Sequence, residues 1–233
     1  MTSRAGSSGV LPRARLLEGG LDAAMSLIGT LLIHERQGVP DRVARIVEVE
    51  AYGGPEDRAS HARAGRTRRT APMFGPPGLA YVYLVYGMYH CLNVVTGVEG
   101  EAGAILIRSV EPVAGIEAMR SGVAEARARR RAVRSTSGHG PAGRVPDERI
   151  AAGPGRLCAA FGIDRSFTGI DVCSPASALR VEQDSRPDAR AVIQTPRIGI
   201  GYAGEPWASV PWRLVVTASR SISGPRPLRR GPD

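Results

Sequence analysis

Lysine is absent from this chain of 233 residues, so all 31 of its cationic side chains are arginines. This absence excludes any mechanism that needs a lysine Schiff base, except one formed by the terminal amine. Cysteine is scarce as well, and Cys91, Cys158 and Cys173 are too widely spaced to form a CxxC pair. Their number and spacing argue against a disulfide framework and against a zinc site, so we expect a reducing compartment and no metal.

Acidic residues are outnumbered and long apolar runs are missing. The 22 acidic side chains face 31 arginines, which gives a formal net charge of +9 and a sequence pI near 10.4. Such a basic protein favours a polyanionic partner, and nucleic acid is the first candidate. No apolar stretch approaches the length of a membrane span and no apolar leader follows Met1, so we expect no contact with a membrane.

The length and the hydrophobic content of 42% favour one domain. We expect an α+β fold in which helices surround a curved, largely antiparallel sheet and a β-hairpin protrudes. The domain is expected over residues 12–218, between a flexible N-terminus at 1–11 and a flexible basic tail at 219–233. Within it, the Ser, Gly and Pro content of 134–150 predicts a mobile loop.

The order of the expected elements follows from hydrophobic periodicity and from the positions of glycine and proline. A helix that breaks near Gly29 and gives way to a short strand is expected within 21–33. A second helix is expected from Pro112 to about Arg131, and a short one over 155–161. The expected strands cover 43–52, 80–86, 89–96 and 104–110, with strand-like patterning again at 197–202 and 212–217.

The strand at 43–52 carries two carboxylates on one face. Because side chains alternate along a strand, Glu48, Glu50 and Tyr52 point to the same side. One interpretation is a solvated sheet face on which the glutamates pair with arginines. The other is a general base at the strand end, where Gly53 begins a turn. His61 follows in a polar segment, and a single histidine is more often structural than catalytic.

Five of the six tyrosines gather around one predicted hairpin, at positions 52, 81, 83, 86 and 89. Glycine as the first residue of the connection Gly87-Met88 predicts a type II′ turn. Tyr81 and Tyr83 share a face, whereas Tyr86, Met88 and Tyr89 lie at or beside the tip. Large side chains at a hairpin tip can wedge into a base stack, and an aromatic pair deeper in the sheet can sandwich an extruded base.

Five longer sequence motifs, which include these residues, carry a resemblance to a known family. They are RIVEVEAYGGPEDRASHA at 45–62, MFGPPGLAYVYLVYGMYHCLNVV at 73–95, AILIRSVEPVAG at 104–115, GPGRLCAAFGI at 153–163 and RIGIGYAGEPW at 197–207. Together they resemble the alkyladenine (3-methyladenine) DNA glycosylase family over about residues 16–216. Several long motifs in the same order are a stronger signal than any one short pattern.

The resemblance implies a catalytic pair and a base pocket. Glu50 matches the carboxylate that activates the attacking water, and Arg108 matches the arginine that helps to hold that water and the carboxylate. Tyr52, Tyr83 and His61 match the walls of the base pocket. Asn93 matches the amide at the pocket floor, which disfavours guanine by a clash with its exocyclic amine.

The resemblance also implies a surface for DNA. Tyr86 matches the wedge that fills the gap left by the flipped nucleotide, with Met88 and Tyr89 beside it in the minor groove. Arg156 stands at a phosphate-contact position. The arginine run from Arg127 to Arg131 is either a solvated helix face or a further set of phosphate contacts.

The expected function is therefore a monofunctional DNA glycosylase of base excision repair. It would flip alkylated or deaminated purines out of duplex DNA and hydrolyse the N-glycosidic bond, leaving an abasic site. We expect a monomer without cofactor, in the cytoplasm or, in a bacterium, with the nucleoid. The alternatives are a noncatalytic nucleic-acid-binding module on the same scaffold and an RNA-processing role, which competition between duplex DNA and structured RNA would separate.

Overall fold

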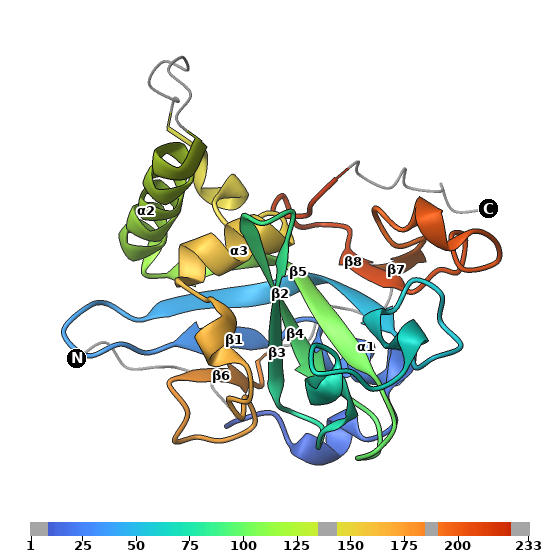
Figure 1. The fold of residues 1–233 in the computed structure, drawn as a ribbon. Helices are drawn as coiled ribbons and strands as arrows, with labels where there is room; N and C mark the ends of the chain where they lie inside the picture. The colour runs from blue at the N-terminus through green and yellow to red at the C-terminus, as the bar shows by residue number, and fades with distance from the viewer. Residues whose placement is uncertain (1–8, 135–143, 185–190, 225–233) are drawn as a thin grey trace.

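The computed structural model describes residues 9–134, 144–184 and 191–224, which form an α+β domain around one antiparallel sheet (Figure 1). Within these residues the sheet has eight strands in the order β3-β4-β5-β2-β1-β6, with β8 pairing to β2 and β7 to β8. The strands are β1 (Leu31–His34), β2 (Arg42–Tyr52), β3 (Ala80–Val85), β4 (Tyr89–Val95), β5 (Ala104–Ala114), β6 (Leu179–Glu182), β7 (Val192–Thr195) and β8 (Arg213–Val216). The predicted fold class is confirmed.

The core forms where the helices pack on the two longest strands and their neighbours. The helices are α1 (Gly20–Leu27), α2 (Ile116–Arg134) and α3 (Pro154–Phe161). Helix α1 packs on β2 and β5, α3 packs on β4 and β5, and α2 packs on α3. Figure 1 shows α2 and α3 at the same end of the molecule as the tip of the β3–β4 hairpin. This arrangement brings the hairpin tip next to both helices.

The hairpin is confirmed, but its turn lies one residue earlier than predicted. Val85 pairs with Tyr89, and the backbone N–H of Met88 donates to the carbonyl oxygen of Val85 at 3.1 Å. The central residues of the turn are therefore Tyr86 and Gly87, with φ of 50° and 67°. Positive φ at both central positions is the mark of a type I′ turn, which follows the twist of the strands. The predicted type II′ turn over Gly87-Met88 is wrong.

Two other predictions of secondary structure are wrong. Strand β5 runs through Pro112 to Ala114 because this stretch pairs with the start of β2, where Pro112 faces Ala44 beside a register shift. Proline is tolerated at such an irregularity, and the helix begins only at Ile116. The stretch 197–202 is not a strand, since it passes through loop into a short 3-10 helix at Gly201–Ala203.

Each of the three segments predicted to be flexible contains buried residues. Leu11 has no exposed surface, so the ordered chain begins before residue 12. Residues 144–150 include a 3-10 helix and the buried Ile150, whereas 135–143 lie outside the described residues. At the start of the predicted tail, Ser219, Ser221 and Ser223 are buried. Over the part of the chain that the structure describes, no helix is both long and apolar enough to cross a membrane.

Candidate active site

The two carboxylates of β2 are buried at the centre of the sheet. Glu48 and Glu50 have no exposed surface. β5 pairs with this part of β2 on one side and β8 pairs on the other, while the segments of Ile198 and Ser223 contact the two carboxylates. The prediction of a solvated sheet face is therefore wrong, although its second half, pairing with arginines, is confirmed. The register between β2 and β5 shifts on either side of Glu48. Such bulges re-aim side chains next to functional sites.

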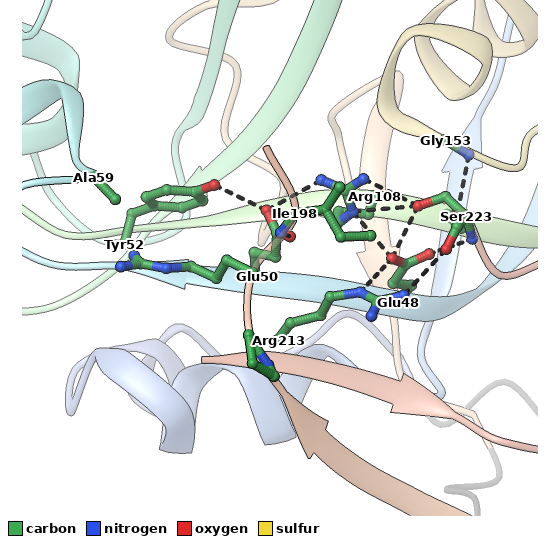
Figure 2. Close-up of polar contacts among 12 residues, drawn as sticks. Glu48, Glu50, Tyr52, Ala59, Arg108, Gly153, Ile198, Arg213 and Ser223 are labelled. Atoms are coloured by element: carbon green, nitrogen blue, oxygen red, sulfur yellow. Dashed lines mark hydrogen bonds and ion pairs between the residues drawn. The ribbon is translucent and has the colours of Figure 1, made fainter. Parts of the chain in front are cut away.

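Glu50 is held by three hydrogen-bond donors. Its Oε2 accepts from the Tyr52 hydroxyl at 2.8 Å and from Arg108 Nη1 at 3.2 Å. Its Oε1 accepts from the backbone N–H of Ile198 at 2.7 Å. Figure 2 shows Tyr52 and Arg108 reaching this carboxylate from opposite sides. An ionised carboxylate offers about four acceptor positions, so one position on Oε1 is left for a further donor.

Glu48 accepts a hydrogen bond from Arg108 and holds the guanidinium in place. Its Oε1 accepts from Arg108 Nε at 3.0 Å and from Arg213 Nε at 2.7 Å, and it also accepts from Ser223 Oγ at 2.9 Å. Its Oε2 accepts from the Ser223 backbone N–H at 2.5 Å. Burial alone would raise the pKa of Glu48, but the charges of Arg108 and Arg213 lower it. Glu48 is therefore an anion near pH 7, and it orients Arg108 toward Glu50.

The charges of this cluster also act on Arg108 and Tyr52. Burial opposes the charge of Arg108, but Glu50 and Glu48 outweigh it and raise the pKa of the guanidinium. Burial and the neighbouring Glu50 raise the pKa of Tyr52 well above its usual value. Tyr52 therefore stays protonated and donates its hydroxyl hydrogen to Glu50.

An ion pair fastens the loop after β2 to the segment that supplies Ile198. Arg197 donates from Nη1 to Asp57 Oδ2 at 2.6 Å and from Nη2 to Asp57 Oδ1 at 2.9 Å. Asp57 also accepts from the backbone N–H groups of Gly53 and Ala59 at 3.1 and 3.0 Å. Neither side chain of the pair is exposed. The pair therefore fixes both the turn that follows Tyr52 and the backbone donor to Glu50.

An aromatic pocket lies beside Tyr52. The residues that line it are Tyr52, Ala59, His61, Met73, Tyr81, Tyr83, Asn93, Ala104 and Tyr202, around a cavity of about 50 Å³. The ring centres of His61 and Tyr83 are only 4.3 Å apart, with their planes at 72°. A cavity of this size is far below the several hundred Å³ of ordinary ligand sites. A flat base would therefore need side chains that line the cavity to move.

Two pocket residues have well-defined polar states. Burial, with smaller effects from Arg69 and Arg63, lowers the pKa of His61 to about 4, so its ring is neutral near pH 7. The Nδ2 of Asn93 donates to the carbonyl oxygens of Tyr81 and Cys91 at 3.0 and 3.4 Å. These two bonds fix the orientation of the amide at the floor of the pocket.

The predicted DNA-contacting residues lie at the hairpin tip and on α3. Tyr86 is 84% exposed, Tyr89 is 37% exposed and Met88 is partly buried between them. Arg156 is exposed on the first turn of α3. A Cβ on Gly155 would come within 2.7 Å of the Tyr89 ring, so only glycine lets the hairpin and α3 meet this closely.

The structure thus brings Glu50, Arg108, Tyr52, His61, Tyr83 and Asn93 together, and it places Tyr86, Met88, Tyr89 and Arg156 on the neighbouring surface. Sequence reasoning missed Glu48 as the support of Arg108, and it missed Asp57, Arg197, Arg213 and Ser223. The only local signal for these residues was the presence of Asp57 and Arg197 inside the quoted motifs. Their partners depend on which distant segments pack together.

Comparison with known proteins gives evidence about this chain that does not depend on the geometry of the site. The family model described as methylpurine-DNA glycosylase (MPG) matches residues 16–220. Two bacterial proteins share the name "Putative 3-methyladenine DNA glycosylase". The one from Anaeromyxobacter dehalogenans strain 2CP-C is 43% identical over 218 residues, which cover 93% of this chain and 88% of that protein.

The second, from Myxococcus xanthus, is 43% identical over 223 residues, which cover 95% of this chain and 98% of that protein. A human protein named DNA-3-methyladenine glycosylase is 38% identical over 202 residues, which cover 86% of this chain and 63% of the human protein.

Proposed function

Because this chain belongs to the methylpurine-DNA glycosylase family, we propose that it flips alkylated or deaminated purines out of duplex DNA and hydrolyses their N-glycosidic bond. The observation that carries this proposal is the coordination of Glu50. Three donors hold the carboxylate in place and leave one acceptor position on Oε1. That position suits the O–H of a water molecule.

Glu50 acts in this proposal as the general base. The water gives one proton to Glu50 while its oxygen attacks the anomeric carbon of the flipped nucleotide. The bond from that carbon to the base nitrogen breaks, and its electron pair leaves with the base. A purine alkylated at a ring nitrogen is cationic, so it departs as a neutral molecule without a separate proton. A deaminated purine is neutral, so one of its ring nitrogens must take up a proton from solvent as the bond breaks. Arg108 and Tyr52 orient the carboxylate.

The aromatic pocket is proposed to select the base. Tyr52 and Tyr83 would present electron-rich faces to the flipped purine, and a cation is favoured over a neutral base on such faces. His61 supports the same preference because its neutral ring adds no repulsion toward a cationic base. Asn93, with its amide orientation fixed, would clash with the exocyclic amine of guanine.

The hairpin tip is proposed to hold the duplex open. Tyr86 projects into solvent and would occupy the space of the extruded nucleotide, with Met88 and Tyr89 in the minor groove. A damaged base leaves its stack more cheaply than a normal one, so extrusion itself adds selectivity. We propose that the protein acts as a monomer on DNA, in the cytoplasm or at the nucleoid, and that Arg156 contacts a backbone phosphate.

The products are proposed to be a free base and an intact strand with an abasic site. Strand cleavage by glycosylases of the lyase type needs an amine that forms a Schiff base, and this chain has no lysine. Strand breaks should therefore appear only after treatment with alkali.

Single-turnover excision tests the proposal. The substrates are duplexes that carry one hypoxanthine, one 3-methyladenine, one 7-methylguanine or one etheno-adenine. We compare the wild type with Glu50→Gln and with Glu56→Gln, which makes the same chemical change on an exposed side chain six positions away. Glu50→Gln should lower the excision rate by about 10²- to 10⁴-fold while DNA binding persists, and Glu56→Gln should leave the rate unchanged.

Three other outcomes would contradict the proposal. Tight binding to all four lesions without release of any base by the wild type would favour the noncatalytic binding module. Equal excision by the wild type and Glu50→Gln would remove Glu50 from the mechanism. Stronger binding to structured RNA than to duplex DNA at the same salt concentration would favour the RNA-processing role.

A further inference from the structure

A second cavity lies outside the base pocket, between α2, α3 and the first residue of β4. Its volume is about 150 Å³, and its lining includes Arg127 and Arg130 from α2, Arg156 from α3, and Tyr89. The other lining residues are Val123, Val145, Ile150, Gly155 and Ala159, so none is acidic. The share of liquid volume of one water molecule is about 30 Å³, so the cavity has room for a phosphate group with its oxygens.

The three arginines of this cavity differ from the neighbouring Arg129 in whether a carboxylate pairs with them. In the described part of the chain, no carboxylate pairs with Arg127, Arg130 or Arg156. Arg129, on the same helix, pairs with Glu125 at 3.8 Å. Arg127 and Arg130 are three residues apart and therefore lie on one face of α2. The cavity thus concentrates cationic charge that no carboxylate of the described residues pairs with.

Two of the guanidinium groups are held in position. The guanidinium carbon of Arg130 lies 5.0 Å from the centre of the Tyr89 ring. Arg156 Nη1 donates to the carbonyl oxygen of Arg149 at 3.0 Å, which leaves its other N–H groups for a ligand. A guanidinium fork that is oriented in advance loses less entropy when it binds the oxygens of a phosphate.

We propose that this cavity binds one backbone phosphate of the duplex DNA that the hairpin opens, and that Arg127 and Arg130 are its main anchors. The proposal rests on the proposed function, because it takes DNA as the partner. It extends that function by adding a site on α2, a helix that contributes nothing to the base pocket. Tyr89 joins the cavity to the turn of Tyr86, three residues earlier in the chain. A strand wedged open by Tyr86 therefore has its backbone next to the cavity.

Binding measurements across a series of salt concentrations test the site. The probe is a fluorescent duplex with one hypoxanthine, and the readout is its anisotropy. The double variant Arg127→Gln/Arg130→Gln should bind about tenfold more weakly than the wild type and should lower the slope of log K against log salt by about one. Arg129→Gln is the matched control for Arg127→Gln, because each removes one charge from the same helix and Arg129 lines no part of the cavity.

Three further variants and substrates separate phosphate binding from structural damage. Arg127→Gln alone keeps the contact between Arg130 and Tyr89 and should still weaken binding. Arg127→Lys/Arg130→Lys should restore the salt slope, because lysine also binds phosphate as a point charge. A duplex with a neutral methylphosphonate, placed in turn at each linkage near the lesion, should weaken binding by the wild type at one linkage and have no such effect on the double glutamine variant.

The outcomes distinguish this site from the proposed function. A double variant with the salt slope of the wild type overturns the phosphate site, even if excision is normal. DNA binding with the expected slopes but without excision leaves the phosphate site standing and removes the glycosylase activity.

Discussion

The guanidinium carbon of Arg197 lies 4.7 Å from the centre of the Tyr52 ring, and it lies 5.0 Å from the ring of Trp212. Arg197 therefore fills the space between two aromatic rings while its nitrogens bind Asp57. The hydroxyl of the same Tyr52 donates to Glu50. One buried cation thus positions both a wall of the base pocket and a donor to the proposed general base.

The first prediction concerns Asp57→Asn. The substitution leaves Arg197 as a buried cation without its carboxylate, which should destabilise the fold by about 3–5 kcal/mol in denaturant unfolding. The double variant Asp57→Asn/Arg197→Met removes the unpaired charge and should lose less stability than Asp57→Asn alone. A double variant that is less stable than Asp57→Asn would show that the packing of Arg197 matters more than the ion pair.

The second prediction concerns pH and His61. Its pKa is about 4 in the folded protein and about 6.5 in an unfolded chain, so the unfolded state binds more protons between these values. The stability of the wild type relative to His61→Gln should therefore be constant above about pH 6.5 and should fall as the pH drops toward 4. Chemical denaturation of both proteins at several pH values measures this difference, and a constant difference would contradict the prediction.

The third prediction separates stability from function at Tyr86. A non-glycine residue with φ of 50° carries a conformational cost, and Tyr86 is 84% exposed with little packing to lose. Tyr86→Gly should therefore raise the free energy of unfolding by up to about 1 kcal/mol. The same variant should excise damaged bases at least about tenfold more slowly if the side chain is the wedge. Full excision activity would remove Tyr86 from that role.

The fourth prediction concerns the segment that ends at Ser223. Its backbone N–H and its hydroxyl group both contact Glu48, and its Oγ also accepts from Arg108. A chain truncated after Ala218 should lose this cover and unfold at a lower temperature than a chain truncated after Gly224. Ser223→Ala should cost about 1–3 kcal/mol, because it removes one hydrogen-bond partner from a buried charge cluster. Equal melting temperatures for the two truncated chains would contradict the prediction.

Local patterns predicted those features that depend on neighbouring residues. The near-alternating pattern of β2 placed Glu48, Glu50 and Tyr52 on one face, and the structure confirms that they share it, since all three join one cluster. Patterns of this kind also located the hairpin and α3. They failed at Pro112, where pairing with β2 extends the strand, and at Tyr86, where the twist of the hairpin imposes positive φ on a tyrosine.

The order of amino acids already shows the chemistry available to this protein: its cationic side chains are all arginines, it has no lysine, and its family motifs contain the proposed catalytic and pocket residues. The burial of Glu48 and Glu50 follows from the three-dimensional fold, because the distant segments of Ile198 and Ser223 contact the two carboxylates. The fold also decided that Ser223 covers Glu48 from 175 positions away. Such contacts depend on strand register and on which distant segments pack together, and no local pattern records either.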